Sequence, residues 1–236
     1  ELVMPEGLHV ADGGEIALAV RPDSRELEAL LDAFVPTIAA GSLLGNILIE
    51  RYLEDAERLS DPTAEAARAR FERLRPLFEE AGERFGFDWR LLAAQGFHES
   101  RLDQDARSAR GAIGVMQLLA TTAAEPYVAM PEIERVEVNI TAAAKYARWL
   151  VDTYFDDPAI TDFDRALFAL AAYNAGPGNI AEARARAEAR GLDPDRWFDH
   201  VELATAEVVS SEPVRYVRGI YKYYVTYRRL LESEPG

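Results

Sequence analysis

Apolar residues at helical spacing run from Asp61 almost to the C-terminus, and few folds are compatible with such a pattern. Residues three or four positions apart lie on one face of an α-helix, so each apolar stripe predicts a helix with one buried side. Residues that typically begin or end helices stand between the stripes. We therefore expect a mainly α domain that spans residues 58–236.

Local signals predict where several of these helices begin and end. Pro62 suits the first position of a helix that Gly86 should end. Asp88 should cap the next helix, which is expected from Trp89 to about His98. The further start and stop signals are Asn139, Thr161, Asp164, Gly176, Gly191 and Pro213.

The last helix, which begins at Pro213, is apolar on two neighbouring faces. A helix of this kind is expected at the centre of a domain, because both faces must be covered. One face carries Val214, Val217, Tyr221, Tyr224 and Leu231, and the other carries Tyr216, Ile220, Tyr223 and Tyr227.

The first 57 residues follow a different pattern. Glu15–Val20 has the alternation of a short strand, and Leu27, Leu30 and Phe34 form a helical stripe. A second apolar segment follows at residues 43–52. A single strand cannot form a sheet. We therefore expect residues 1–57 to be a short α/β remnant and linker, with the body of the domain, the export signal and any lipid anchor preceding Glu1.

Composition limits the partners and cofactors. The formal net charge of −15 disfavours nucleic acid, which basic patches bind, so none is expected as a partner. Cysteine is absent, and His9, His98 and His200 lack the spacing of metal ligands, so we expect no cofactor and no metal. No apolar stretch reaches the roughly 18 residues of a membrane span. We expect a monomer that associates with a membrane only through a missing N-terminal anchor.

Glu99 is the first candidate for catalytic chemistry. It continues the stripe of Trp89, Leu92 and Gly96, so its carboxyl is expected at the core-facing end of a helix. Burial raises the pKa of a carboxyl and favours the protonated form that a general acid needs. A solvated Glu in a frayed last turn is the alternative, and position alone does not separate the two.

Asn174 and a glycine-containing loop are further candidates. Asn174 ends the stripe of Phe163, Leu167 and Leu170, and its amide either caps its own helix or contacts a ligand. The loop after Glu99 contains two glycines within four residues, at Gly111 and Gly114, which suggests a close approach of the backbone to another group.

Four short motifs stand in a fixed order along the chain. They are Glu99-Ser100, Gly114-Val115-Met116-Gln117, Ala172-Tyr173-Asn174-Ala175-Gly176 and Tyr216-Val217. Together they resemble the motifs of the family 1 lytic transglycosylases over about residues 70 to 232, with Val115 in place of the family's usual leucine. The resemblance implies the lysozyme-like helical fold of the soluble lytic transglycosylases and goose-type lysozyme.

The same resemblance implies an activity and a set of site residues. The expected reaction breaks the β-1,4 bond between N-acetylmuramic acid and N-acetylglucosamine in peptidoglycan without water, and it yields a 1,6-anhydromuramoyl product. Glu99 would act first as general acid and then as base. The residues expected to line the groove are Ser100, Ser108, Met116, Gln117, Tyr173, Asn174 and Tyr216.

Within that set, Tyr216 is expected to bond Glu99 or a sugar acetamido group, and Gln117 and Asn174 are expected to hold sugar amides. Arg110 replaces a residue that is often small in the family, which leaves the polar contacts on that side open. His98, next to Glu99, points about 100° away around the helix, so a structural role is expected for it.

The N-terminal segment carries a second resemblance. Residues 41–52 resemble the junction in membrane-bound lytic transglycosylases of type F, and residues 15–35 resemble the last strand and helix of the solute-binding domain that precedes that junction. This implies a periplasmic protein that is associated with the outer membrane in its full-length form. The alternatives are a hydrolytic lysozyme on the same fold and a non-catalytic module that senses cell-wall glycans or peptides.

Overall fold

The computed structural model describes residues 24–38 and 62–232, and the chain divides into two units, residues 1–60 and 61–236. In the first unit the described element is helix α1 (Arg25–Ile38), on which Leu27, Leu30 and Phe34 are exposed. The helix predicted from this apolar stripe is therefore present. The predicted strand at Glu15–Val20 and the apolar segment at residues 43–52 lie outside the described residues.

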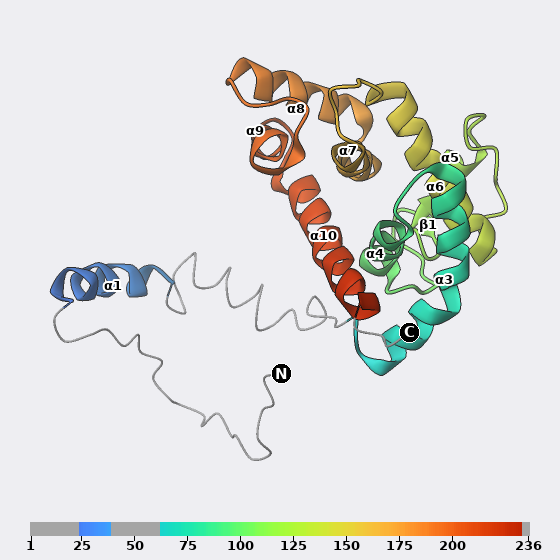
Figure 1. Cartoon of the computed structure of the whole chain (residues 1–236), viewed down its shortest axis with the longest axis horizontal. Helices are drawn as coiled ribbons and strands as arrows, with labels where there is room; N and C mark the ends of the chain where they lie inside the picture. Colours follow the sequence, from blue (N-terminus) through green and yellow to red (C-terminus); the bar gives the residue numbers. More distant parts are fainter. Residues whose placement is uncertain (1–23, 39–61, 233–236) are drawn as a thin grey trace, which may run out of the picture. The chain divides into compact units, whose positions relative to one another are not determined.

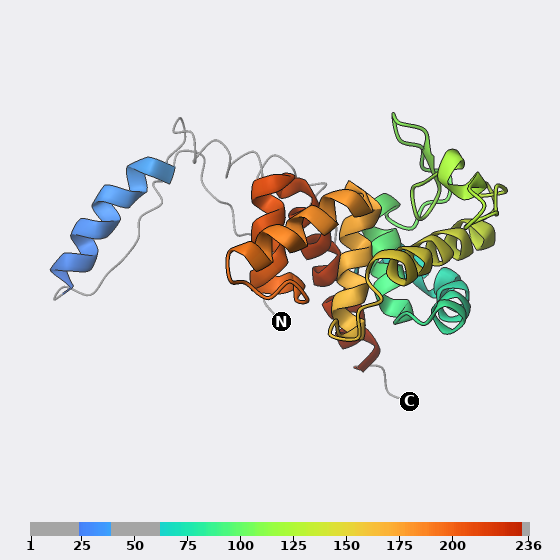
Figure 2. The ribbon, with the colours of Figure 1, turned by 90° about the horizontal axis from the view of Figure 1, so that it is seen from above.

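The second unit is built almost entirely of helices, as the apolar stripes predict (Figure 1). Helix α10 runs beside α4, which also packs against α3. The segment around α5 lies at the opposite end of this unit from α8 and α9 (Figure 2). The helices described in the second unit are α3 (Glu65–Phe85), α4 (Trp89–Ser100), α5 (Ala120–Ala124), α6 (Val136–Tyr154), α7 (Asp162–Ala175), α8 (Pro177–Ala189), the short η3 (Trp197–Val201), α9 (Glu202–Val208) and α10 (Ser211–Glu232).

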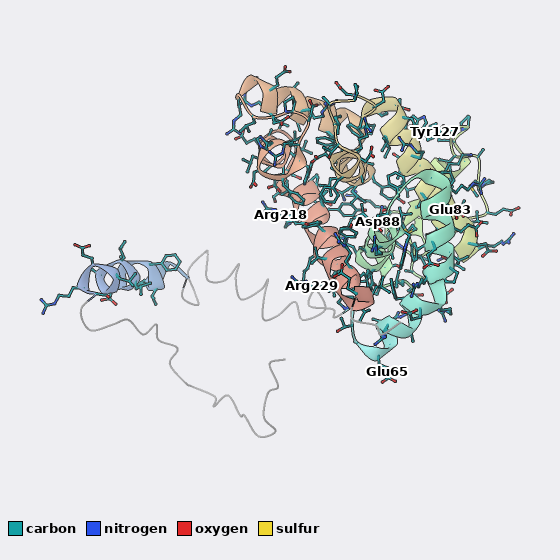
Figure 3. All side chains as sticks on the ribbon, in the orientation of Figure 1. Glu65, Glu83, Asp88, Tyr127, Arg218 and Arg229 are labelled. Atoms are coloured by element: carbon teal, nitrogen blue, oxygen red, sulfur yellow. The ribbon has the colours of Figure 1, made fainter. Side chains whose placement is uncertain are left out.

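The junction between α3 and α4 follows the predicted local signals. Gly86 ends α3 with a φ of 71°, in the left-handed region that glycine adopts without strain. Asp88 caps α4 by accepting a hydrogen bond of 3.0 Å from the backbone N–H of Arg90. The same carboxylate accepts a bond of 2.9 Å from the Tyr224 hydroxyl, so the start of α4 is fastened to α10. Figure 3 labels Asp88 among the side chains of the second unit.

Three predicted helix starts need correction. Helix α3 begins at Glu65 and not at Pro62, because the residues from Pro62 onward form a turn first. Helix α6 begins at Val136, and Asn139, which was expected to open it, is buried in its first turn. Helix α10 begins at Ser211, two residues before Pro213. The predicted cap of α7 is present, since the Thr161 hydroxyl accepts a hydrogen bond from the backbone N–H of Asp164 in the first turn of the helix.

Helix α10 packs a broad apolar face into the hydrophobic core, formed by the two neighbouring faces that the sequence shows. Its other side carries Arg215, Arg218 and Lys222 and is exposed, so the helix covers the core, and the prediction that it lies at the centre needs correction. Tyr227 is fully buried and stacks on Phe71 of α3, with ring centroids 4.2 Å apart. Tyr223 meets Phe97 of α4 edge to face at 4.8 Å. Each buried aromatic side chain contributes about 2–3 kcal/mol of hydrophobic stabilisation. These contacts fix the position of α4 and therefore of the residues at its end.

A short hairpin follows α4. Its strands β1 (Ala112–Ile113) and β2 (Leu118–Leu119) pair antiparallel. Gly114, at the turn, has a φ of 78°, and a Cβ there would lie 2.8 Å from the Asn139 amide nitrogen. Only glycine fits this position, which explains one of the two glycines that the sequence places in the loop. A small second core supports the hairpin and consists of Leu118, Ala123, Val128, Ile133 and Ala142.

Candidate active site

Glu99 lies in the last turn of α4, at the edge of the core. Leu92 and Gly96, on the same stripe, are buried, and Glu99 itself is partly buried. The helix ends at Ser100, and the next residue, Arg101, has a φ of 60° that turns the chain away two positions after the acid. The Glu99 carboxyl therefore lies close to solvent but within the shelter of the neighbouring elements. The frayed, solvated alternative does not apply.

The environment of Glu99 favours its protonated form. Burial raises the pKa of Glu99 from 4.5 to about 7, because a charged carboxylate loses hydration in the protein interior. The hydrogen bond from the Tyr216 hydroxyl acts in the opposite direction and lowers this pKa, because it stabilises the charged form. Near neutral pH both forms of Glu99 are populated, which suits a group that gives up a proton and later takes one.

Tyr216, on α10, makes the closest polar contact of the acid. Its hydroxyl donates a hydrogen bond of 2.5 Å to Oε1 of Glu99 and accepts one of 3.2 Å from Nε2 of Gln95. Both Tyr216 and Gln95 are buried. Of the two contacts expected for Tyr216, the one to Glu99 is therefore made within the protein. Burial and the nearby Glu99 hold the pKa of Tyr216 well above its ordinary value, so the hydroxyl keeps its proton.

The hairpin is fastened beside α4 by two helices. The backbone N–H of Met116 donates a bond of 2.8 Å to Oδ1 of Asn139, on α6. Its carbonyl oxygen accepts a bond of 2.9 Å from the Tyr173 hydroxyl, on α7. Tyr173 also interacts electrostatically with Glu99, and this interaction and burial raise its pKa. Two helices thus set the position of the hairpin that borders the acid.

The position of the Met116 side chain differs from the sequence-based prediction that this residue lines the groove. It is fully buried, and its sulfur lies 3.2 Å from where a Cβ on Gly96 would be. Because Gly96 has no side chain, the hairpin lies directly against α4 and the thioether fills the space between them. Met116 therefore contributes packing and its two backbone groups, and its side chain is not a contact for a ligand.

Three predicted groove residues stabilise the loop after α4. Ser100 Oγ donates a bond of 2.9 Å to the carbonyl of Val115, which joins the end of α4 to the hairpin. Ser108 is exposed, and its Oγ accepts a bond of 3.0 Å from the backbone N–H of Ala112. Gln117 donates from its amide nitrogen to the carbonyl of Gly114 at 2.9 Å. Each side chain thus has a structural partner and lies in the segment that follows Glu99.

Asn174 differs from its expected surroundings. It follows Tyr173 in the last turn of α7, but its side chain is exposed and does not extend the apolar stripe into the core. The backbone N–H of Gly176 closes the helix end by donating to the carbonyl of Ala172 at 2.7 Å. The amide of Asn174 is therefore not needed as a cap, and it faces solvent.

Other polar residues near the acid are arranged for structure or lie in solvent. The His98 ring packs edge to face on Tyr216, with centroids 5.0 Å apart, and a Cβ on Gly219 would lie 2.7 Å from it. Burial and the nearby Arg101 lower the pKa of His98 to about 4, so the ring is neutral at neutral pH. Asp103, Asp105 and Arg110 are exposed. Within residues 24–38 and 62–232 no cluster of acidic or histidine side chains could hold a metal ion.

Sequence reasoning missed two residues that organise this site. In the sequence Gln95 is a polar residue among apolar neighbours in the expected helix. Its position one turn before Glu99 is the signal that could have placed it on the side of the acid, where it contacts Tyr216. Asn139 reads as a helix start. It is fully buried, and its amide nitrogen also donates to the carbonyls of Ile113 and Ile133.

The helical fold is shared with solved lytic transglycosylases and is lysozyme-like. The soluble lytic transglycosylase SLT70 of Escherichia coli matches at 22% identity with a TM-score of 0.53, covering 88% of this chain and 35% of that one. The lytic transglycosylase Slt of Pseudomonas aeruginosa matches at 22% identity with a TM-score of 0.51, covering 89% and 30% of the two chains.

Residues 76–194 match the Transglycosylase SLT domain family, and the chain belongs to this family. Its curated relatives include the membrane-bound lytic murein transglycosylase F of Marinobacter nauticus, which is 36% identical over 204 residues. The protein of the same name in Maricaulis maris is 40% identical over 168 residues. These matches cover 79% and 65% of this chain but 40% and 36% of the relatives, so the chain spans less than half of their length.

Proposed function

We propose that this chain carries the catalytic domain of a peptidoglycan lytic transglycosylase. The substrate would be the glycan strand, cleaved at the β-1,4 bond between N-acetylmuramic acid and N-acetylglucosamine. The observation that carries the proposal is the Glu99 carboxyl, partly buried at the end of α4 with its pKa raised to about 7 and bonded to Tyr216. The family and the names of the relatives support the same substrate class.

In the proposed reaction, neutral Glu99 donates its proton to the glycosidic oxygen as the bond from that oxygen to C1 of the muramoyl sugar breaks. The acetamido group of the same sugar stabilises the positive charge that develops at C1. The carboxylate left on Glu99 then removes the proton of the C6 hydroxyl, whose oxygen bonds to C1 and gives the 1,6-anhydro ring. No water is consumed, and Glu99 recovers its proton.

A single carboxyl fits this route better than hydrolysis by two. A retaining glycosidase places a second carboxylate about 5–5.5 Å from the acid. Asp103 and Asp105, the nearest acidic residues along the chain, are exposed in the loop after α4. They offer no sheltered nucleophile beside Glu99. This favours attack by the substrate's own hydroxyl over a hydrolytic lysozyme reaction.

The neighbouring polar residues would hold the sugars. The Gln117 amide nitrogen donates to loop carbonyls, so its oxygen is the atom left to accept from a sugar amide. The exposed Asn174 amide can both donate and accept, as an acetamido group requires. Ser100, Ser108 and Tyr173 would border the strand, and Met116 would support the hairpin through its backbone.

The setting of the whole protein is a further proposal, supported by the relatives' names, which say membrane-bound, and by the resemblance of residues 15–52. We propose a periplasmic location with attachment to the outer membrane, and residues 1–57 as the remnant of a solute-binding domain. Among the described residues, no helix is long and apolar enough to cross a membrane. The partners would be glycan strands and muropeptides, and the domain would act as a monomer without metal or cofactor.

Digestion of purified peptidoglycan tests the proposal. We expect soluble muropeptides that end in 1,6-anhydromuramic acid, which mass spectrometry distinguishes from hydrolysis products because these are heavier by one water. Glu99→Gln is the matched control and should release them at least about a thousandfold more slowly. Reducing ends in place of anhydro ends would establish a lysozyme. Intact walls that still bind the protein would establish a sensing module.

A further inference from the structure

We infer that Gln95 is a positioning residue for Glu99: it orients the Tyr216 hydroxyl so that this group donates to the carboxylate. The role of Glu99 as the acid rests on the proposed function, whereas the contacts among the three side chains do not. Gln95 lies on α4 one helical turn before Glu99, and 1% of its surface is exposed. A buried amide requires polar partners, because an unpaired one is destabilising.

The three side chains form a chain of hydrogen bonds between α4 and α10. Nε2 of Gln95 donates to the Tyr216 oxygen at 3.2 Å, and the Tyr216 hydroxyl donates to Oε1 of Glu99 at 2.5 Å. The first and last members belong to the same helix, so α4 contacts the tyrosine from two successive turns. Tyr216 is thus held between two groups whose separation the helix fixes.

The chemistry of the amide nitrogen decides the direction of this chain. An amide N–H group can donate but cannot accept, so it occupies a lone pair of the tyrosine oxygen. The hydroxyl has one hydrogen, which is left to point at the carboxylate. Without Gln95 the hydroxyl can rotate about its bond to the ring and donate elsewhere. A donor on the tyrosine oxygen also polarises the O–H bond and strengthens the bond to Glu99.

This arrangement assigns different roles to the two oxygens of Glu99. Oε1 accepts from Tyr216, which in a neutral carboxylic acid is the role of the carbonyl oxygen. The acidic proton of Glu99 therefore belongs on Oε2. Gln95 thereby fixes, through Tyr216, which oxygen delivers the proton to a glycosidic oxygen.

The other ionisable groups around Glu99 do not compete with this effect near neutral pH. Tyr173, from α7, has a raised pKa and stays neutral. His98, on α4, has a pKa of about 4 and is also neutral. Arg101 directs its guanidinium to the carbonyls of Phe97 and His98. A change in the titration of Glu99 on substitution of Gln95 would therefore not come from these groups.

Gln95→Met tests the inference, because methionine has nearly the same length and no polar hydrogen. NMR titration of the labelled Glu99 carboxyl carbon should show its pKa raised by about half a unit or more, since a weakened bond from Tyr216 favours the charged form less. Turnover should fall about threefold to tenfold, which is the change in rate that corresponds to the net free energy of one hydrogen bond. KM should change little. Leu91→Met, a buried substitution on the same helix, should leave the pKa of Glu99 unchanged.

A double-mutant cycle shows whether Gln95 acts through the tyrosine. In a Tyr216→Phe background, Gln95→Met should produce no further change in the pKa of Glu99. An equal change with and without the hydroxyl, or no change in either, would overturn the inference. If Gln95→Met does not fold, the wild-type protein decides: the side-chain amide signals of Gln95 should titrate with Glu99, and unresponsive signals would overturn it.

The titrations need no substrate. If the wild-type protein cleaves no peptidoglycan, the proposed function is wrong. The positioning role of Gln95 is tested independently, by the NMR titration of Glu99.

Discussion

The Tyr216 hydroxyl donates a hydrogen bond of 2.5 Å to Oε1 of Glu99, which lies 117 positions earlier in the chain. Burial and this bond act on the pKa of Glu99 in opposite directions, and burial has the larger effect. The acid consequently titrates near neutral pH and not near 4.5. Each of the two influences can be altered separately.

Tyr216→Phe removes the bond and keeps the ring. The pKa of Glu99 should rise above 7, because the group that stabilises its charged form is lost. The alkaline limb of the kcat/KM profile should move to higher pH, and kcat should fall. Unfolding in urea should show a loss of about 1–2 kcal/mol, because the buried Gln95 amide loses its acceptor. Tyr221→Phe, on the same helix, is the control and should not move the alkaline limb of the kcat/KM profile. An equal shift of this limb in both variants would contradict the effect of Tyr216 on the pKa of Glu99.

Glu99→Gln removes the acid and keeps the shape of the side chain. Turnover of peptidoglycan should fall by at least about a thousandfold, within the range of general acid and base catalysis. The circular dichroism spectrum should match that of the wild type, since Gln retains the hydrogen-bond partner of Tyr216. Near-normal turnover in this variant would mean that another group supplies the proton.

The same variant changes the dependence of stability on pH. The pKa of Glu99 is raised in the folded state. Below about pH 4.5 the carboxyl is protonated in both the folded and the unfolded state, so it does not lower the free energy of unfolding. Between about pH 4.5 and pH 7, Glu99 ionises in the unfolded chain but keeps its proton in the folded protein. The free energy of unfolding of the wild type therefore falls across this range by on the order of 1–3 kcal/mol. Urea titrations across this window should show that Glu99→Gln lacks the decrease. Parallel curves for the two proteins would exclude a buried acid.

His98→Gln tests whether the residue next to Glu99 takes part in the chemistry or only in packing. The His98 pKa of about 4 leaves the ring neutral across the working range, and its contacts are Tyr216 and Gly219. Turnover should stay within about tenfold of the wild type, below the usual effect of removing a general base, which is 10²–10⁴-fold. The ring signals of wild-type His98 should not titrate above about pH 5. A loss as large as that of Glu99→Gln would give His98 a chemical role.

Asn139→Leu tests the fastening of the hairpin. The substitution leaves the backbone N–H of Met116 without an acceptor and should lower the free energy of unfolding by about 2–4 kcal/mol. Amide hydrogen exchange should increase in the hairpin, Ala112–Leu119, more than in α10. Thr141→Ala, two residues further along α6, is the control and should leave exchange in the hairpin unchanged. Equal increases across the whole domain would indicate that Asn139 is only a core residue.

Much of the fold follows from signals within a few residues of each other. Gly86, Asp88 and Thr161 act on their own helix ends, so their roles can be read without knowing what packs nearby. The broad buried face of α10 follows from its apolar positions, which is also a local pattern. The mainly helical class required nothing more than these patterns.

The remaining features depend on partners that are distant in the sequence. Asn139 resembles a helix start, but its partner is a backbone N–H 23 positions away. Gln95 is bonded to a residue 121 positions away. The Met116 side chain is buried because Gly96 lets the hairpin touch α4, which neither residue indicates alone. The sheltered position of Glu99 could be predicted because its stripe is a local pattern, and it became the candidate acid because three further motifs follow it in a fixed order.

Both polar backbone groups of Met116 are bonded within the protein, one to α6 and one to α7. A segment held in this way has little conformational entropy left to lose, so a strand that binds beside it spends less of its interaction energy on ordering the protein. The wall of the site next to the acid is therefore preorganised, and in the proposed reaction a glycan strand would meet it already in place.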